Sequence, residues 1–299
     1  MDKKKDRDLQ ADPKSAQPAG PTDFDRRDFL TGAASLMAAT VTAGSASAAT
    51  SDVSPLPAPD VSKTTVLVTG ANRGLGLEFT RQYLERGWRI IATCRNPGKA
   101  EVLNALAAET PDVVVEQLDV VEHQQIDALA AKYINIPIDV LINNAGIGGG
   151  SENQLFGRLN YDAYRTVLDV NAFGPIKIAE AFVDHVKASE LKKIITVSSS
   201  QGSIASVEMP MLYWYRSSKS ALNMLMVNLA LQLKRRGIIV GLVTPGATAT
   251  DFIDARFRKA IPGIREPEIA AADMIRNIDR FTLENSGTFF NYDGGIVPW

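Results

Sequence analysis

Short apolar runs alternate with amphipathic stretches along residues 64–299 of the chain. Most of these runs are continuous rather than alternating with polar residues, as strands buried on both faces of a parallel sheet require. The predicted strands are Thr65–Thr69, Arg89–Thr93, Val113–Leu118, Val140–Asn143, Lys193–Ser198, Ile238–Val243 and Thr288–Asn291.

Helical periodicity separates the strands, and this alternation predicts an α/β fold. We expect one Rossmann-type, doubly wound parallel sheet of about seven strands, with right-handed crossovers and helices on both faces. Residues 63–299 then form a single domain, without an internal repeat. The predicted helices are Leu75–Glu85, Ala100–Ala108, Gln124–Lys132, Tyr161–Ala188, Trp214–Arg235 and Pro267–Phe281.

The amino-terminal stretch has the layout of an export signal. Arg26-Arg27 lies in a twin-arginine core, the uncharged residues 29–48 follow, and Ala46-Ser47-Ala48 matches a cleavage site. We therefore predict a Tat signal at residues 1–48, a flexible leader rich in Pro, Ser and Ala at 49–62, and a periplasmic or otherwise exported protein. A retained anchor and a disordered tail with a chance Arg-Arg pair are the alternatives, and the weak hydrophobicity of 29–48 argues against a stable membrane span.

Composition limits the remaining possibilities. Removal of residues 1–48 leaves 299 − 48 = 251 residues, enough for one domain with a substantial core. The net charge is −2, so nothing favours binding to nucleic acid or to an anionic membrane. Cys94 is the only cysteine, which excludes an intramolecular disulfide, and the only histidines, His123 and His185, have no metal-ligand spacing. No metal site is expected.

A glycine-rich run follows the first predicted strand and opens a predicted helix. Glycines in such a turn let backbone N–H groups approach a pyrophosphate, and the helix N-terminus favours its charge. An ordinary strand-to-helix turn is the alternative. The candidate cofactor-binding residues of the run are Gly70, Asn72, Arg73, Gly74, Leu75 and Gly76.

Tyr215 and Lys219 are the candidate catalytic pair. They are four residues apart, so they share one helix face, although such a pair is common on any amphipathic helix. A nearby ammonium favours tyrosinate, and we therefore expect Lys219 to lower the pKa of Tyr215 toward neutrality. Ser199, at the end of an apolar run, is the candidate third member, with Ser198 and Ser200 as alternatives within the serine run.

Together with Asn143-Asn144-Ala145-Gly146, Asn171 and Pro245-Gly246, these motifs resemble the short-chain dehydrogenase/reductase family from Thr64 to Trp299. The segments Tyr213–Asn223 and Asn291–Trp299 resemble its C-factor and sniffer-type carbonyl reductases. The resemblance implies that Ser199 binds the substrate oxygen, that Tyr215 exchanges a proton with it, and that Lys219 also binds the nicotinamide ribose. It further implies that Asn171 supports a water leading to Lys219. The additional cofactor contacts implied are Asp119, Val120, Asn143, Ala145, Gly146, Pro245, Gly246, Thr248 and Thr250.

Charge at the end of the second strand bears on the choice of nucleotide. NAD-binding relatives usually place a carboxylate there, whereas this strand runs into Thr93-Cys94-Arg95. Arg95 and Arg73 match a 2′-phosphate, because guanidinium groups bind phosphate oxygens in a bidentate manner. We therefore expect NADP(H) in preference to NAD(H); two arginines on a solvated rim are the alternative.

The predicted function is the interconversion of a carbonyl and an alcohol on a small to medium, mostly apolar substrate. Apolar residues near Tyr215 and after Pro245-Gly246 suggest an apolar cleft, although they are also compatible with core or dimer contacts: Met209, Met211, Leu212, Tyr213, Trp214, Phe252, Ile253 and Phe257. An exported dinucleotide-binding signalling or structural protein with little turnover is the alternative. A Ser/His hydrolase ranks lower, because Gly-x-Ser-x-Gly is absent.

Assembly as a homodimer is expected from the two long predicted helices, Tyr161–Ala188 and Trp214–Arg235, which family members commonly pair across a two-fold axis. Both carry apolar stripes that could exceed what the sheet can cover.

Substitution of the twin arginines tests the export route. Because the Tat route carries folded proteins, Arg26→Lys combined with Arg27→Lys should leave uncleaved, nucleotide-bound protein in the cytoplasm. Fractionation of the double variant beside the wild type measures this. Wild-type protein that stays uncleaved in the cytoplasm, or a double variant that is exported as efficiently, would contradict the signal.

Overall fold

The computed structural model of the chain describes residues 63–253 and 258–299. The predicted signal (1–48), the predicted leader (49–62) and Phe257 lie outside the described residues, so export and cleavage stay predictions. Within the described part of the chain, no helix is long and apolar enough to cross a membrane.

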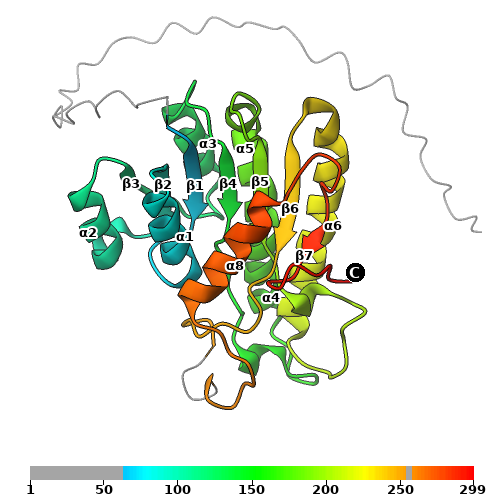
Figure 1. Cartoon of the computed structure of the whole chain (residues 1–299). Coiled ribbons are helices and arrows are strands. Elements are labelled where there is room, and N and C mark those ends of the chain that lie inside the picture. Colours follow the sequence, from blue (N-terminus) through cyan, green and yellow to red (C-terminus); the bar gives the residue numbers. More distant parts are fainter. Residues whose placement is uncertain (1–62, 254–257) are drawn as a thin grey trace, which may run out of the picture. The chain divides into compact units, whose positions relative to one another are not determined.

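Seven parallel strands form one sheet in the order β3-β2-β1-β4-β5-β6-β7 (Figure 1). This confirms the predicted fold class. Each strand lies within about one residue of its predicted bounds, apart from β7, of which only two residues pair with β6. The strands are β1 (Thr65–Thr69), β2 (Arg89–Cys94), β3 (Val113–Gln117), β4 (Val140–Asn143), β5 (Lys193–Val197), β6 (Ile239–Val243) and β7 (Phe289–Phe290).

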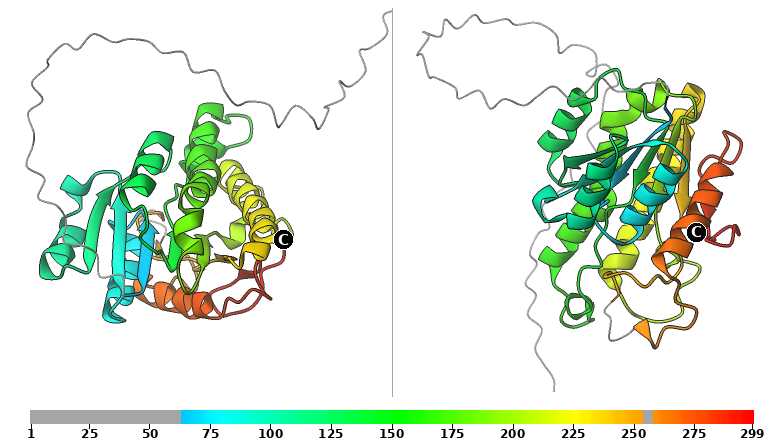
Figure 2. Two further views of the ribbon diagram at one scale, coloured as in Figure 1. Left: turned by 90° about the horizontal axis from the view of Figure 1, so that it is seen from above. Right: turned by 60° about the vertical axis from the view of Figure 1, so that its left-hand side comes forward.

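Helices cover both faces of the sheet, as the two further views show (Figure 2). Helices α1 and α8 pack against each other on one face, and α3, α5 and α6 cover the other (Figures 1 and 2). The helices are α1 (Gly74–Glu85), α2 (Glu101–Glu109), α3 (His123–Lys132), α4 (Tyr161–Leu168), α5 (Gly174–Lys187), α6 (Tyr213–Leu233) and α8 (Pro267–Asp279).

Two apolar cores result, one on each side of the sheet. Phe79 and Tyr83 of α1 and Met274 of α8 are fully buried in the first, and Phe182 of α5 and Met226 of α6 are fully buried in the second. Burial of side chains of this size stabilises the fold by about 1.5–3 kcal/mol each. The sheet is therefore held from both faces, which fixes the ends of its strands.

The helix predicted over Tyr161–Ala188 is helical almost throughout, but it is not a regular α-helix. α4 runs directly into a π-helical turn at Asp169–Phe173, which runs into α5. Pro175 explains the irregularity, because it lacks an N–H and its ring would clash with the carbonyl four residues earlier in a regular α-helix. Proline is tolerated in the first turn of a new helix, where Pro175 lies in α5.

The strand order reverses between β1 and β4. β1 pairs with β2 on one side and β4 on the other, and the crossovers from these strands leave in opposite directions along the sheet. In open α/β sheets, ligands bind in the crevice outside the carboxyl ends of the strands at this point. The fold therefore predicts a ligand site among the loops after β1, β4, β5 and β6.

Candidate active site

The glycine-rich turn after β1 has a backbone that only glycine adopts without strain. Gly70 and Gly74 have φ angles of 67° and 53°, in the left-handed region. A Cβ atom at Gly76 would lie 2.1 Å from the Gly70 carbonyl oxygen, so a side chain there would displace the turn. No side chain caps the N-terminus of α1, and its first turn holds no acid. The turn and helix end are thus suited to receive an anion.

Asn144 joins this turn to the end of β4. Its Nδ2 donates to the carbonyl oxygens of Thr69 (2.8 Å) and Gly70 (3.2 Å), while the Thr69 hydroxyl accepts from the backbone N–H groups of Asn144 and Ala145. Sequence reasoning singled out the neighbouring Asn143 instead. The Asn143 side chain is buried and donates to the Pro175 carbonyl at 3.2 Å. Because successive residues at a strand end point to opposite sides, one asparagine of the pair faces the turn and the other faces α5.

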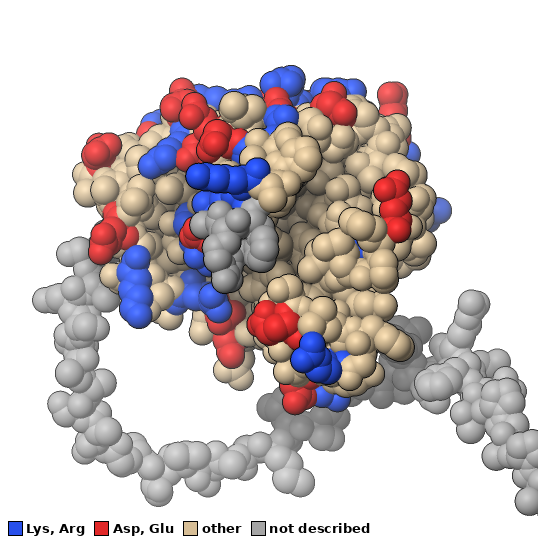
Figure 3. All heavy atoms as spheres, turned by 90° about the horizontal axis from the view of Figure 1, so that it is seen from below, with Lys and Arg blue, Asp and Glu red and all other residues tan. Residues whose placement is uncertain are grey.

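The carboxyl ends of the strands border a cleft of about 760 Å³. Figure 3 looks onto this end of the molecule and shows a hollow bordered largely by uncharged side chains. Most of the predicted site residues line the cleft; Asn143 and Asn171 do not. The predicted residues that line it are Gly70, Asn72, Arg73, Gly74, Leu75, Gly76, Arg95, Asp119, Val120, Ala145, Gly146, Ser199, Tyr215, Lys219, Pro245, Gly246, Thr248 and Thr250.

Two arginines stand at the end of the cleft beside the glycine-rich turn. Arg95 follows β2 and is exposed, and Arg73 precedes α1 with its side chain 67% exposed. Arg73 pairs with Asp251 at 3.1 Å, and Asp251 also pairs with Arg258 at 3.3 Å. Ion pairs this exposed contribute little to stability and exchange readily. The guanidinium groups of Arg73 and Arg95 are therefore both suited to bind an anionic ligand.

Tyr215 and Lys219 lie in the first turns of α6, at the opposite part of the cleft. Tyr215 is 9% and Lys219 5% exposed. The Lys219 ammonium donates to the Val197 carbonyl at the end of β5 (3.0 Å) and lies 6.0 Å from the centre of the Tyr215 ring. A Cβ atom at Gly146 would lie 3.7 Å from the same nitrogen. The ends of β4 and β5 thus enclose the cation.

Burial controls the ionisation of both side chains. It raises the pKa of Tyr215 to about 12, while the Ser199 hydroxyl lowers that pKa because it can donate a hydrogen bond to the phenol oxygen. Burial also lowers the pKa of Lys219 to about 8. The expectation that Lys219 brings the pKa of Tyr215 down toward neutrality is therefore wrong for this structure, because desolvation of the phenolate is the larger effect. The phenol is protonated at neutral pH.

The three serines Ser198, Ser199 and Ser200 make different contacts. Ser198 is buried and donates to Asn223 Oδ1 at 2.6 Å, away from the phenol. Ser199, the predicted serine, accepts from the Gln201 N–H at 3.2 Å and has its hydroxyl beside Tyr215. Ser200 begins the short 3₁₀-helix that follows. Of the three, Ser199 is the one placed to act together with the phenol.

Asn171 is fully buried in the π-helical turn and reaches across to the loop after β4. Its Oδ1 accepts from the Ile147 N–H (2.9 Å), and its Nδ2 donates to the Ile147 carbonyl (2.9 Å) and to Ser218 Oγ (3.0 Å). Asn171 therefore fastens this loop to α6 one residue before Lys219. The water that it was expected to support stays a prediction.

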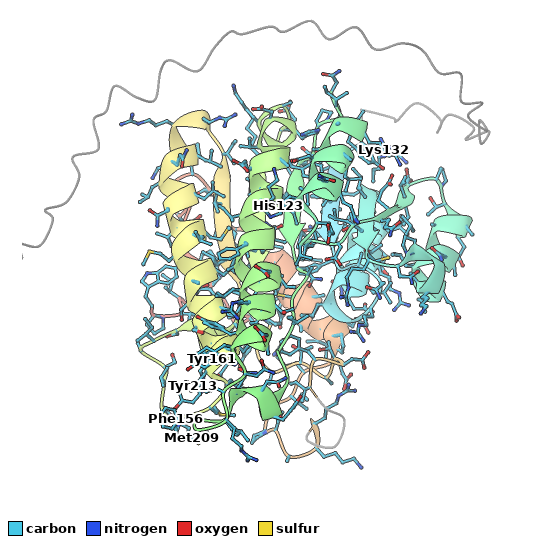
Figure 4. All side chains as sticks on the ribbon, turned by 180° about the vertical axis from the view of Figure 1, so that it is seen from behind. His123, Lys132, Phe156, Tyr161, Met209 and Tyr213 are labelled. Carbon is cyan, nitrogen blue, oxygen red and sulfur yellow. The ribbon has the colours of Figure 1, made fainter. Side chains whose placement is uncertain are left out.

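The predicted apolar side chains separate into two groups. Met211, Leu212, Phe252 and Ile253 line the cleft, and the Phe252 ring lies 5.2 Å from the Tyr215 ring, centre to centre. Met209 and Tyr213 lie outside it, where Tyr213 stacks against Phe156 beside the start of α6 (Figure 4). Trp214 is buried and stacks on Tyr164 at 4.3 Å.

The two histidines are separated. His123 is exposed at the start of α3 (Figure 4), whereas His185 Nε2 lies 3.1 Å from the Ala130 carbonyl. Within residues 63–253 and 258–299, no group of three or more His, Cys, Asp or Glu side chains is placed to hold a metal ion.

Comparison with known families agrees with this geometry. The model of the short chain dehydrogenase family matches residues 64–260. The chain belongs to this family. The match spans the glycine-rich turn, the Asn143–Gly146 segment and the Ser199, Tyr215 and Lys219 cluster.

Curated relatives include enzymes and a signal. This short-chain dehydrogenase is 35% identical over 240 residues to 1-hydroxy-2-glutathionyl-2-methyl-3-butene dehydrogenase of Rhodococcus sp. (strain AD45), covering 79% of the chain and 99% of that protein. It is 33% identical over 176 residues to the C-signal of Myxococcus xanthus, covering 58% of the chain and 99% of that protein. The predicted likeness to the C-factor branch is thus confirmed as a likeness.

Solved structures with this fold include carbonyl reductases. The NADPH-bound carbonyl reductase from chicken fatty liver superposes with a TM-score of 0.72 at 28% identity, covering 79% of this chain and 99% of that one. The carbonyl reductase Sniffer of D. melanogaster superposes with a TM-score of 0.73 at 27% identity, covering 79% and 100%. This short-chain dehydrogenase is therefore an oxidoreductase with a carbonyl reductase-like structure.

Substitution of Lys219 by methionine tests whether burial of the Lys219 ammonium lowers the stability of the folded protein. At pH 7 Lys219 is protonated in both the folded and the unfolded state, and burial of the ammonium costs the folded state about 2–4 kcal/mol, as its depressed pKa indicates. Wild-type stability should therefore rise as the pH increases from about 8 toward 10.5, the ordinary pKa of a lysine side chain. Lys219→Met should be at least as stable as wild type at pH 7, and this advantage should shrink as the pH rises.

Urea denaturation of both proteins at several pH values, without added nucleotide, measures this effect. Lys234→Met, which removes an exposed lysine, serves as the matched control and should keep the wild-type pH dependence. An identical pH slope for wild type and Lys219→Met would show that the ammonium is not desolvated.

Proposed function

We propose that this protein reduces the carbonyl group of a small to medium, mostly apolar aldehyde or ketone with NADPH, and that Tyr215 donates the proton. The observation that carries the proposal is the buried, protonated Tyr215 phenol, which shares the cleft with Ser199, Lys219 and the glycine-rich turn. Reduction requires a proton donor at the substrate oxygen, and a neutral phenol can serve as one.

The residues on the cleft wall fit a dinucleotide. Gly70, Gly74 and Gly76 leave room for a pyrophosphate beside the uncapped start of α1, and Arg73 and Arg95 supply positive charge where a 2′-phosphate would bind. No carboxylate follows β2 to accept a hydrogen bond from an unmodified ribose. The NADPH in the chicken carbonyl reductase structure supports the same choice.

The protein's own groups supply the acid chemistry. Ser199 would donate a hydrogen bond to the substrate oxygen, and Tyr215 would protonate that oxygen as negative charge develops on it. The Lys219 ammonium would stabilise the tyrosinate that remains, since an opposite charge within about 6 Å favours the ionised form. When bound, the nicotinamide would supply the hydride to the carbonyl carbon.

The substrate side of the cleft favours an apolar molecule. Phe252 covers the Tyr215 ring, and Met211, Leu212 and Ile253 line the same region. A cleft lined by such side chains with a few convergent polar groups binds apolar substrates and orients them by their single polar function. The carbonyl would face Ser199 and Tyr215, with the rest of the substrate against Phe252.

Signalling or structural nucleotide binding with little turnover is the second candidate. The similarity to the C-signal favours it. The presence of Ser199, Tyr215 and Lys219 together favours an enzyme, because each group needed for proton transfer is in place.

Assembly of the chain as a homodimer stays a prediction.

Tyr215→Phe removes the proton donor and keeps the ring. We expect kcat to fall by a factor of about 10²–10⁴, corresponding to about 3–5 kcal/mol of transition-state stabilisation, with nearly unchanged NADPH affinity. NADPH absorbance with a panel of aldehydes and ketones measures kcat, and nucleotide titration measures Kd. Tyr213→Phe, which changes a tyrosine outside the cleft, is the matched control. A Tyr215→Phe enzyme with more than a tenth of the wild-type kcat would exclude the phenol as the acid.

Arg95→Asp tests the choice of nucleotide. The carboxylate should repel a 2′-phosphate and accept a hydrogen bond from an unmodified ribose, which moves the preference from NADPH toward NADH. Kd values for both nucleotides, measured by fluorescence titration, report this shift. Lys99→Asp makes a similar charge change nearby but outside the residues that line the cleft. Equal Kd values for NADPH and NADH in the wild type would refute the 2′-phosphate site.

A further inference from the structure

Gln154 is a buried amide between the loop after β4 and the start of α6. It lies in the short 3₁₀-helix Ser151–Gln154 and is 2% exposed. Sequence reasoning passed over it, because no motif marks this position. Its side chain nevertheless contacts the backbone of Tyr215 and the backbone of the loop Gly148–Gly150, which lines the cleft.

Helix α6 begins without a cap from its own segment. Leu212 precedes it with a φ of 53°, an unusual left-handed conformation for leucine, and its side chain makes no cap hydrogen bond. The first N–H groups of a helix have no intrahelical partner. Gln154 Oε1 accepts from one of them, the Tyr215 N–H, at 2.9 Å. Gln154 thus supplies the cap from a segment that lies 61 positions away.

The same side chain holds the glycines after β4. Gln154 Nε2 donates to the carbonyl oxygens of Gly148 (2.7 Å) and Gly150 (2.9 Å), both of which line the cleft. A Cβ atom at Gly148 would lie 3.4 Å from the Phe252 ring, so this loop also contacts the wall that covers Tyr215.

Trp214 and Asn153, which precede Tyr215 and Gln154, make a second connection between the same segments. Trp214 Nε1 donates to the Asn153 carbonyl at 2.9 Å, and Asn153 Nδ2 donates to the Gly149 carbonyl at 3.0 Å. The segment that carries Gln154 is therefore fastened to both sides of the cleft. A buried amide with these partners satisfied fixes one geometry, since loss of any partner leaves a desolvated polar group.

We propose that Gln154 is a positioning residue, which sets the place of the Tyr215 phenol relative to the loop Gly148–Gly150 through these three hydrogen bonds. The inference rests on the proposed function of Tyr215 as proton donor. Gln154 does not line the cleft itself, so it acts through the Tyr215 backbone and the loop. Small errors in the position of a reacting group are costly: about 1 Å lowers a rate by about 10²-fold.

Gln154→Met tests the proposal, because methionine has a similar volume and neither donates nor accepts as the amide does. We expect kcat to fall by about 10- to 100-fold, while the Kd for NADPH changes by less than about two-fold. Hydrogen exchange of the Tyr215 amide should become faster in the same variant, and this readout does not require a substrate. Kinetics use whichever aldehyde or ketone of a panel the wild-type enzyme reduces.

Gln154→Glu is the conservative variant. Burial raises the pKa of a carboxyl group, and the protonated form can both accept from the Tyr215 N–H and donate to one glycine carbonyl. The kcat of this variant, relative to wild type at the same pH, should therefore rise as the pH falls. Gln154→Met should show no such recovery. If Gln154→Met does not fold, this pH profile decides the question.

Gln82→Met is the matched control. It makes the same substitution at a glutamine outside the cleft, where Gln82 Nε2 donates to the Glu268 carbonyl at 2.9 Å, and should leave kcat and the exchange of the Tyr215 amide unchanged. Unchanged kcat and unchanged Tyr215 amide exchange in Gln154→Met would overturn the inference. If instead wild type reduces no carbonyl compound, or Tyr215→Phe stays active, the proposed function fails, and amide exchange alone still decides whether Gln154 holds the Tyr215 backbone.

Discussion

The arrangement of the cleft depends on the hydrogen bond from the Lys219 ammonium to the Val197 carbonyl. This hydrogen bond joins the carboxyl end of β5 to α6 at 3.0 Å, within an environment that lowers the pKa of the lysine to about 8. Placing a cation there costs free energy, which the carbonyl oxygen offsets only in part. A packed hydrophobic side chain would satisfy the fold better, and this favours the role proposed for Lys219 in the cleft.

The rest of the cleft depends on where the strand ends are fixed. Thr69, at the end of β1, accepts from the backbone after β4, and Asn144 returns two hydrogen bonds to the glycine-rich turn. Asn171 and Gln154 then attach the following loop to α6, at Ser218 and at Tyr215 respectively. Each of these side chains is an amide or hydroxyl that bonds to backbone atoms, so the geometry is set without additional charge. The basic side chains that line the cleft lie at its two ends, with Arg73 and Arg95 at one and Lys219 at the other.

Sequence patterns predicted what depends on local chemistry. Continuous apolar runs located the strands, the glycine-rich run located the turn at α1, and the four-residue spacing brought Tyr215 and Lys219 to one face of a helix. What depends on packing was harder to predict. The predicted long helix contains a π-helical turn next to Pro175, and the asparagine that faces the glycine-rich turn is Asn144 rather than Asn143. The pKa of Tyr215 is raised rather than lowered, because the largest effect on it is burial of the phenol, which depends on tertiary packing. Gln154 belongs to no sequence motif, since its partners are backbone atoms: two glycine carbonyls nearby in the sequence and the Tyr215 N–H 61 positions away.

Transfer of deuterium from NADPH labelled at the reactive position of the nicotinamide tests the central claim most directly. The labelled cofactor is mixed with purified protein and an apolar aldehyde or ketone, and the product is analysed by mass spectrometry. Reduction in this cleft predicts one deuterium on the carbinol carbon of the product for each NADP⁺ formed. Tight binding of NADPH without any transfer of the label to carbonyl compounds would contradict the account and leave nucleotide binding alone as the function of the cleft.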